Sequence, residues 1–279
     1  MHLKFFKDIS KASVAEAGGK GASLGELSNA GIPVPPGFVV LASAFDRFLE
    51  ETDLNTEISA RLKEVNIEDT NSIDKASAII RDAIHDRAMP KDLAQEILAA
   101  HKKLGAEWVA IRSSATAEDS AVASWAGELE TYLNTTEENI LENVKKCWSS
   151  LFTPRAIFYR HEKNLIDHYV SVAVVVQTMV QSEVSGIAFT VHPVTEDKDQ
   201  MIIEAGFGLG EAIVSGQITP DSYIISKSER SIIDINISEQ PRKLVRCKKG
   251  AGNVWVDLKN TEGGKQKLSG QEIIAAAKI

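Results

Sequence analysis

Hydrophobic positions in the first part of the chain predict two strands that flank a long helical region. The apolar run Phe38 to Leu41 follows a proline-rich turn and predicts a short buried strand. From about residue 43 to 103, apolar side chains such as Ile80 and Ile84 recur at the spacing of amphipathic helices. A second strand is expected at Trp108 to Ile111. The pattern therefore predicts an α/β (α+β) frame with a helical insertion.

The pattern changes to β-structure in the second half of the chain. Two helices are expected around 137–164. The strands expected after them are roughly 170–180, 184–190, 201–205, 220–226, 231–237, 242–247 and 253–257. This change predicts an N-terminal subdomain at 1–169 and a C-terminal subdomain at 170–279. The apolar helical pattern of 271–279 has no capping glycine, so we expect the second subdomain to be truncated inside a helix.

Composition and charge narrow the class of protein. With 43% hydrophobic and 25% charged residues, the 279-residue chain has the composition of a globular protein. Its net charge of -8 argues against a general nucleic-acid binder, which needs a basic face. The late apolar run Val172 to Val176 is too short to span a bilayer. Cys147 and Cys247 lie far apart, which fits a reducing compartment. We therefore expect a cytoplasmic protein without nucleic-acid or membrane partners.

A glycine-rich segment near the N-terminus is a candidate phosphate site. Gly18, Gly19, Lys20 and Gly21 combine a permissive backbone, one cation and a following helix N-terminus, which suits polyphosphate oxygens. The segment is not a Walker A loop, because Gly21 follows the lysine where that motif has serine or threonine. A plain glycine turn with an exposed lysine remains the alternative.

Arg112 is a second candidate cation. It follows the predicted strand at Trp108 to Ile111 and precedes a pair of serines, so a sheet edge would present its guanidinium to a phosphate. The alternative is an internal ion pair with Glu118 or Asp119, and on the residues alone this alternative is the somewhat stronger one.

The segment Met201 to Glu211 predicts a strand, a glycine turn and a helix start. It superficially matches a dinucleotide-binding fingerprint, but Glu211 stands where the third glycine should be. A tight turn that directs Glu204 and Glu211 at a ligand or cation is the better interpretation. His192 lies in a strand-end turn without a glycine-rich loop, so we interpret it as a surface histidine and not as a phosphate carrier. The sequence identifies no metal ligands.

Together these segments resemble the ATP-binding domain shared by phosphoenolpyruvate synthase, pyruvate phosphate dikinase and the rifampicin phosphotransferases. The resemblance rests on Gly18–Leu27, Gly31–Phe38, Ile111–Asp119 and Glu204–Tyr223, in the order found in that family, and covers essentially the whole chain. The amino-acid sequence of Gly208–Asp221 is most similar to that of phosphoenolpyruvate synthase.

The resemblance implies an ATP-grasp fold, in which two subdomains close on ATP with Mg²⁺. Lys20 and Arg112 would hold the phosphates and act as the catalytic residues, while Gly127 and Thr131 would belong to a loop that covers the phosphates. Gln177 and the backbone around Met179 would reach the adenine. The full set of expected nucleotide-binding positions is Gly19, Lys20, Arg112, Gly127, Thr131, Gln177, Met179, Val180, Glu204 and Glu211.

The reaction implied by the resemblance converts ATP, pyruvate and water to AMP, phosphoenolpyruvate and phosphate through a phosphohistidine. The phosphohistidine domain and the pyruvate-binding domain are absent from this chain, and the acidic segment that supplies magnesium ligands would fall just beyond Ile279. We therefore expect an ATP-dependent phosphotransferase of the pyruvate, water dikinase type whose chain alone does not complete turnover. The alternatives are a rifampicin phosphotransferase-like enzyme and a standalone nucleotide-binding subunit of a split enzyme.

Overall fold

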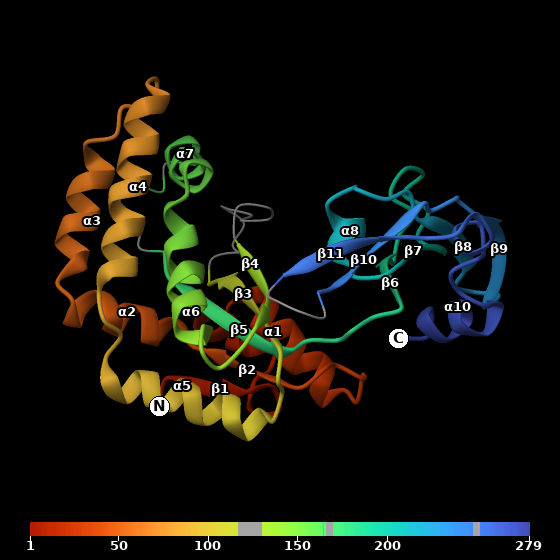
Figure 1. The fold of residues 1–279 in the computed structure, drawn as a ribbon, viewed down its shortest axis with the longest axis horizontal. Coiled ribbons are helices and arrows are strands. Elements are labelled where there is room, and N and C mark those ends of the chain that lie inside the picture. Colours follow the sequence, from red (N-terminus) through yellow and green to blue (C-terminus); the bar gives the residue numbers. More distant parts are fainter. Residues whose placement is uncertain (117–129, 164, 166–169, 248–251) are drawn as a thin grey trace. The chain divides into compact units, whose positions relative to one another are not determined.

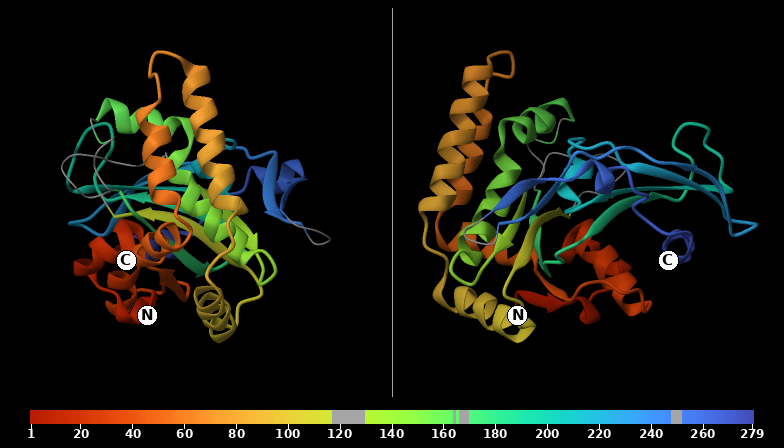
Figure 2. Two further views of the ribbon diagram at one scale, coloured as in Figure 1. Left: turned by 90° about the vertical axis from the view of Figure 1, so that its left-hand side faces the viewer. Right: turned by 45° about the vertical axis from the view of Figure 1, so that its right-hand side comes forward.

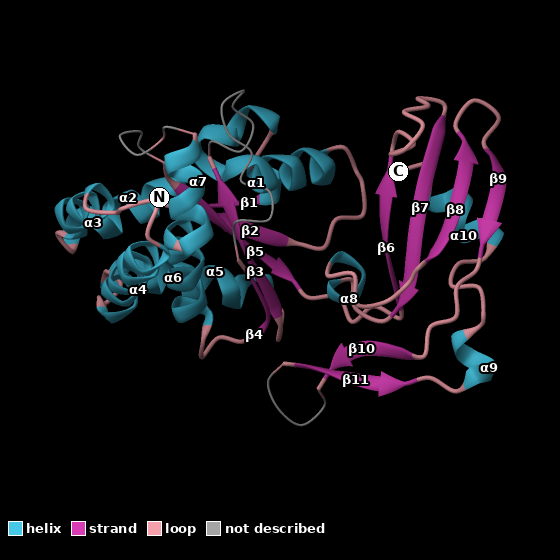
Figure 3. Ribbon diagram, turned by 90° about the horizontal axis from the view of Figure 1, so that it is seen from above, coloured by secondary structure: helices cyan, strands magenta, loops and turns pink. Residues whose placement is uncertain are grey.

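The computed structural model describes residues 1–116, 130–163, 165, 170–247 and 252–279. These residues form two compact units, Met1–Met179 and Val180–Ile279. Each unit combines helices with antiparallel β-sheet (Figures 1 and 3), which confirms the expected α+β class. No helix in the described part of the chain is both long and apolar enough to cross a membrane.

The first unit is built on a five-stranded sheet with the order β1-β2-β5-β3-β4, in which all neighbours are antiparallel. Its strands are β1 (Leu3–Phe5), β2 (Gly37–Val40), β3 (Val109–Ala115), β4 (Thr131–Thr135) and β5 (Val172–Thr178). The central strand β5 contains a run of valines and is buried on both faces, because alternate residues pack into two hydrophobic clusters on opposite sides of the sheet.

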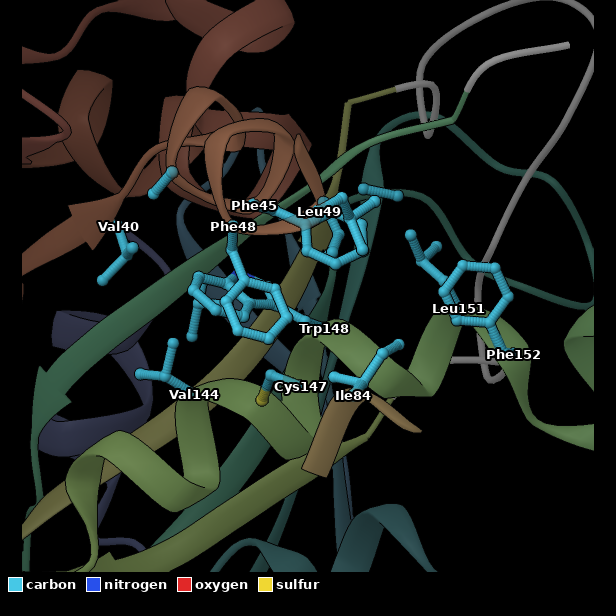
Figure 4. Packing of buried hydrophobic residues seen from close by; sticks show 14 of the residues in the cluster. Val40, Phe45, Phe48, Leu49, Ile84, Val144, Cys147, Trp148, Leu151 and Phe152 are labelled. Carbon is cyan, nitrogen blue, oxygen red and sulfur yellow. The ribbon is translucent and has the colours of Figure 1, made fainter. Parts of the chain in front are cut away.

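Helices cover one face of this sheet and form the main core. Four of them separate β2 from β3, which confirms the helical insertion: α2 (Ala42–Glu51), α3 (Leu54–Lys63), α4 (Thr70–Asp86) and α5 (Lys91–Leu104). Helices α3 and α4 lie side by side (Figure 2). After β4 come α6 (Ile140–Ser149) and α7 (Pro154–Glu162). The Trp148 ring lies 5.5 and 5.1 Å from those of Phe45 and Phe48 in this core (Figure 4).

Helix α1 (Val14–Asn29) covers the opposite face of the sheet. Its Ala17 and Leu24 pack against Val39 of β2 and Val175 of β5. Gly25 allows a close approach, because a Cβ there would lie 2.6 Å from the carbonyl oxygen of Ile9. This smaller cluster attaches the glycine-rich segment to the sheet. Single 3₁₀ turns lie at Phe6–Asp8, Lys11–Ser13 and Ser150–Phe152.

The second unit contains a four-stranded antiparallel sheet, β6-β7-β8-β9, and the separate hairpin β10-β11. The strands are β6 (Val184–Phe189), β7 (Gln200–Phe207), β8 (Asp221–Ser226), β9 (Ser231–Asn236), β10 (Arg242–Arg246) and β11 (Asn253–Asp257). The helices are α8 (Glu211–Val214), α9 (Asn260–Gly263) and α10 (Gly270–Ala276). Ile273 of α10 packs in a core with Met201 and Tyr223.

Two boundaries differ from the sequence-based expectation. The division between the units falls after Met179 and not at 169/170, because β5 pairs along its length with β3 of the first unit. Strand β3 does not end at Ile111 but continues to Ala115. Its polar residues remain in the strand because Arg112, Ser113 and Ser114 all have partners on β5.

Candidate functional site

The strand register brings three of the expected site residues onto one face of the first sheet. Arg112 lies opposite Thr131 of β4 and Val175 of β5, and Gln177 is two residues beyond Val175. Cross-strand partners, and residues two apart on a strand, point to the same face. This face is the one that carries α1, because Val175 packs against that helix.

The glycine-rich segment is a kink within α1. Gly18 has φ 69° and ψ 170°, outside the helical region, so a new helical segment begins at Gly19 and Lys20. A Cβ on Gly18 would lie 2.2 Å from Ser114 Oγ and 2.3 Å from the Ser114 carbonyl oxygen. Only glycine fits both this conformation and this contact. The kink therefore holds the half-buried Lys20 against the strand that carries Arg112.

Arg112 is half-buried, and no carboxylate of the described residues forms an ion pair with it. The two carboxylates of the alternative interpretation, Glu118 and Asp119, lie outside the described residues, as does Gly127. The neighbouring carboxylate Glu130 is engaged elsewhere, because Arg81 of α4 donates to its Oε1 at 2.9 Å. The Tyr132 hydroxyl also donates to Glu130.

The end of β5 is tied to the proline-rich turn before β2. Gln177 Nε2 donates to the Pro35 carbonyl oxygen at 3.1 Å. The Met179 N–H donates to the Trp108 carbonyl oxygen at 2.9 Å, so this N–H is already used within the protein, and the expected contact of Met179 with adenine stays a prediction. Val180, the first residue of the second unit, is exposed.

Glu204 and Glu211 lie in the second unit, on different elements. Glu204 is half-buried in β7, opposite Ile187 and Ser222. Glu211 begins α8 and is exposed, and its Oε2 accepts a hydrogen bond from Asn253 Nδ2 of β11 at 2.7 Å. Their joint use toward a ligand stays a prediction. Within the described residues, no group of three or more His, Cys, Asp or Glu side chains is arranged to hold a metal ion.

The glycine turn between β7 and α8 has a packing role. Gly208 has φ 92°, and a Cβ there would lie 2.4 Å from the Leu244 carbonyl oxygen of β10. The Gly208 N–H donates to Glu183 O at 2.8 Å and the Leu209 N–H to Leu244 O at 2.9 Å. Because the protein itself uses these amides, they are not available for a pyrophosphate, which agrees with the preference for a tight turn over a dinucleotide site.

His192 stabilises its own turn. Its Nδ1 accepts hydrogen bonds from the N–H groups of Val194 and Thr195, each at 3.2 Å. This agrees with the interpretation of His192 as a turn residue.

Sequence reasoning missed a buried polar cluster in the second unit. Asp221 and Lys267 form an ion pair of 2.7 Å, and both side chains are fully buried. Asp221 also accepts hydrogen bonds from the Tyr223 hydroxyl at 2.8 Å and from the Ser238 N–H at 2.9 Å. Burial, opposed by the Leu268 N–H and aided by Asp221, raises the pKa of Tyr223 to about 12. Lys267 stands in the polar stretch Lys265-Gln266-Lys267, so no local signal in the sequence marked its side chain as buried or identified Asp221 as its partner.

Comparison with known proteins gives the family. The family model for "Pyruvate phosphate dikinase, AMP/ATP-binding domain" matches residues 14–279. The chain is 45% identical to the "Probable phosphoenolpyruvate synthase" of Methanocaldococcus jannaschii, over 99% of this chain and 24% of that protein. The protein of the same name from Archaeoglobus fulgidus is 47% identical, over 98% of this chain and 37% of that protein. The "Phosphoenolpyruvate synthase" of Pyrococcus furiosus is 37% identical, over 99% of this chain and 39% of that protein.

The chain thus spans about a quarter to two fifths of the length of these relatives. The matched region includes the kinked segment that carries Lys20, the strand that carries Arg112 and both structural units. The chain belongs to the pyruvate phosphate dikinase AMP/ATP-binding domain family.

Proposed function

We propose that the chain is the ATP-binding part of a phosphoenolpyruvate synthase-like phosphotransferase. The observation that carries the proposal is the match of residues 14–279 to an AMP/ATP-binding domain, together with relatives named phosphoenolpyruvate synthase. The two compact units are proposed to be the subdomains of an ATP-grasp fold.

The α1 face of the first sheet fits a polyphosphate. It carries Arg112, and the kinked segment docked on it carries Lys20. Two cations can offset the charge of the phosphates, and Arg112 can donate two parallel hydrogen bonds. Gly19 and Thr131 complete this proposed phosphate site, the first because it begins the helical segment after the kink and the second because it lies opposite Arg112. In phosphoryl transfer, such positioning and charge neutralisation supply most of the catalysis.

Gln177 suits the recognition of adenine. The Pro35 carbonyl can only accept, so the amide nitrogen of Gln177 must face it and the amide oxygen must face away. That oxygen can accept from the exocyclic amino group of adenine. The Met179 carbonyl is a second acceptor nearby in the chain, and Val180 supplies apolar surface.

We propose that magnesium binds together with the nucleotide. Mg²⁺ is commonly bound by one or two carboxylates together with substrate phosphates, and the described residues contain no larger acidic cluster. When bound, it would neutralise charge on the phosphate oxygens. We propose Glu204 and Glu211 as the carboxylates that this chain contributes near the nucleotide.

We propose the acceptor of the phosphoryl group from the names of the related proteins. Their printed names favour a phosphoenolpyruvate synthase reaction over a rifampicin phosphotransferase reaction. The phosphohistidine and the pyruvate site would then belong to parts of the enzyme other than these 279 residues. The comparisons do not favour the alternative of a standalone nucleotide-binding subunit.

Calorimetric titration with ATP and Mg²⁺ tests the proposal. Lys20→Ala and Arg112→Ala should each weaken ATP affinity roughly tenfold or more, because a charge-assisted contact is worth about 1.5–3 kcal/mol. Lys63→Ala is the control, since Lys63 is an exposed cation at the end of α3 on the other side of the sheet. Equal ATP affinity in wild type and both site variants would refute the assignment of these two residues.

A further inference from the structure

We propose that Ser114 is a positioning residue, whose hydroxyl holds the Lys20 segment in place relative to Arg112. The inference rests on the proposed function, because it concerns the same phosphate site. Ser114 follows Arg112 by two residues on β3, so both side chains point to the α1 face. Ser114 is fully buried and does not itself reach solvent.

The Ser114 hydroxyl bridges the kink in α1. Its Oγ accepts from the Gly21 N–H at 3.2 Å and donates to the Ala17 carbonyl oxygen at 2.9 Å. Ala17 and Gly21 are four residues apart, so an unbroken α-helix would join these two groups directly. Insertion of a side chain into this ladder is a recognised cause of a sharp kink. The strand thus supplies the hydroxyl that stabilises the kink.

The same hydroxyl replaces a missing helix cap. The helical segment after the kink starts at Gly19, which makes Gly18 its N-cap and Gly21 its third residue. An N-cap side chain normally accepts from the N–H of the second or third helical residue, but glycine has no side chain to do so. Ser114 accepts from Gly21 instead, 93 residues away in sequence. Lys20 lies between the cap and this bond, so its backbone is held from both sides.

Sterics support the same role. The absence of a Cβ at Gly18 lets the backbone rest on the oxygen atoms of Ser114. A hydroxyl and a glycine that fit each other this closely determine how far the Lys20 segment lies from β3. Loss of the hydroxyl leaves the Gly21 N–H and the Ala17 carbonyl to pair directly or stay unpaired, and either outcome moves Lys20.

Ser113 provides a matched control. It is the preceding residue on the same strand, it is also buried, and its Oγ bonds to Glu130 O at 3.1 Å, Cys147 O at 3.2 Å and Ser150 Oγ at 3.0 Å. It points to the opposite face, toward the main core. Ser113→Ala therefore removes a buried hydroxyl without touching the Lys20 segment.

Titration of four variants with ATP and Mg²⁺, and with adenosine, tests the inference. Ser114→Ala should weaken ATP affinity roughly fivefold to tenfold, the size of a lost cap, whereas Ser113→Ala should change it less than about twofold. Adenosine affinity should stay unchanged in both, because adenosine has no phosphates. In a Lys20→Ala background, the further change Ser114→Ala should have an effect below about twofold, since coupled residues do not act additively.

The outcomes separate this inference from the proposed function. A wild-type chain that does not bind ATP contradicts the proposed function. If the wild type binds ATP, two results contradict the positioning role. The first is an equal loss of ATP affinity in Ser114→Ala and Ser113→Ala. The second is full additivity of the effects of Ser114→Ala and Lys20→Ala on ATP affinity. Thermal melting shows whether each variant is folded. If Ser114→Ala does not fold, Ser114→Cys is measured with the same expectations, because a thiol keeps the bulk but is a weak hydrogen-bonding group.

Discussion

A single hydrogen bond orients the side chain of Gln177, which we propose as the residue that reads the base. Its amide is oriented by the Pro35 carbonyl, which accepts a hydrogen bond from Gln177 Nε2 at 3.1 Å. The outward amide oxygen is an acceptor, which matches the amino group of adenine and opposes the carbonyl oxygen of guanine.

We therefore predict that the chain binds ATP more tightly than GTP and that Gln177→Ala reduces this preference. A mismatched polar group costs about 1–3 kcal/mol, so the ratio of the two affinities in wild type should be roughly fivefold or larger. Competition binding with the two nucleotides measures it. Gln217→Ala, a change at an exposed glutamine, is the control. Indistinguishable affinities for ATP and GTP in wild type would count against the adenine-reading role.

The sequence marked charged residues as site candidates but gave no indication of a role for Ser114. Lys20 and Arg112 stand out because a cation next to glycines or after an apolar strand is unusual. A serine in a strand has many roles, and the partners of Ser114 lie 93 and 97 residues away. Only the packing of α1 on β3 gives that hydroxyl its function.

At the scale of elements, a buried ion pair and its hydrogen bonds join β8 to the segment before α10 in the second unit. Lys267 Nζ donates to Asp221 Oδ1 at 2.7 Å and also to the Ser238 carbonyl, while the Lys267 N–H donates to Asp221 Oδ2 at 2.9 Å. Gln240 closes the neighbouring turn, since its Nε2 donates to the carbonyls of Phe207 and Arg242, each at 2.9 Å. These bonds hold α10 against the four-stranded sheet.

Lys267→Met should destabilise the second unit strongly. Removal of one partner leaves the Asp221 carboxylate buried without its counter-charge, which costs about 3–5 kcal/mol. Denaturant unfolding followed by circular dichroism measures the loss. Lys265→Met is the control, because Lys265 is exposed and only two residues away. Equal unfolding midpoints for the Lys265 and Lys267 variants would show that the ion pair does not hold the unit together.

The helices and strands themselves were largely predictable. The expected strands between residues 184 and 257 correspond to β6 through β11, and the helical region to α2 through α5. Periodicity succeeds here because each element buries one face, which leaves a local pattern. It failed at the end of β3, where polar residues continue the strand because their hydroxyls find partners inside the fold.

At the scale of the whole molecule, the proposed reaction needs a phosphate carrier and a pyruvate site in addition to a nucleotide site. The only candidate phosphate carrier that the sequence suggested, His192, accepts two backbone hydrogen bonds in a surface turn. Positioning can lower a barrier by roughly 7–11 kcal/mol, but only when the nucleophile and the phosphorus are held together. If the nucleophile lies outside these residues, they do not gain this lowering of the barrier by themselves.

We predict that the purified chain does not convert ATP and pyruvate to phosphoenolpyruvate, and that supplying phosphohistidine and pyruvate-binding domains, fused or in trans, restores turnover. A coupled assay for phosphoenolpyruvate measures both. Formation at about 1 per second or faster by the chain alone would overturn the prediction. Loss of that activity in His192→Ala would then assign the phosphate carrier to His192.

The sequence by itself determined the α+β class, the order of the elements and the segments that carry charge near glycine. These are local properties, because periodicity and turn chemistry act over a few residues. Tertiary structure decided the rest: that β5 is the central strand of the first sheet and the boundary follows Met179, that Ser114 closes the kink beside Lys20, and that Asp221 pairs with Lys267. Each depends on which distant segments pack together, and burial gives such polar pairs their strength only after packing has removed water from them.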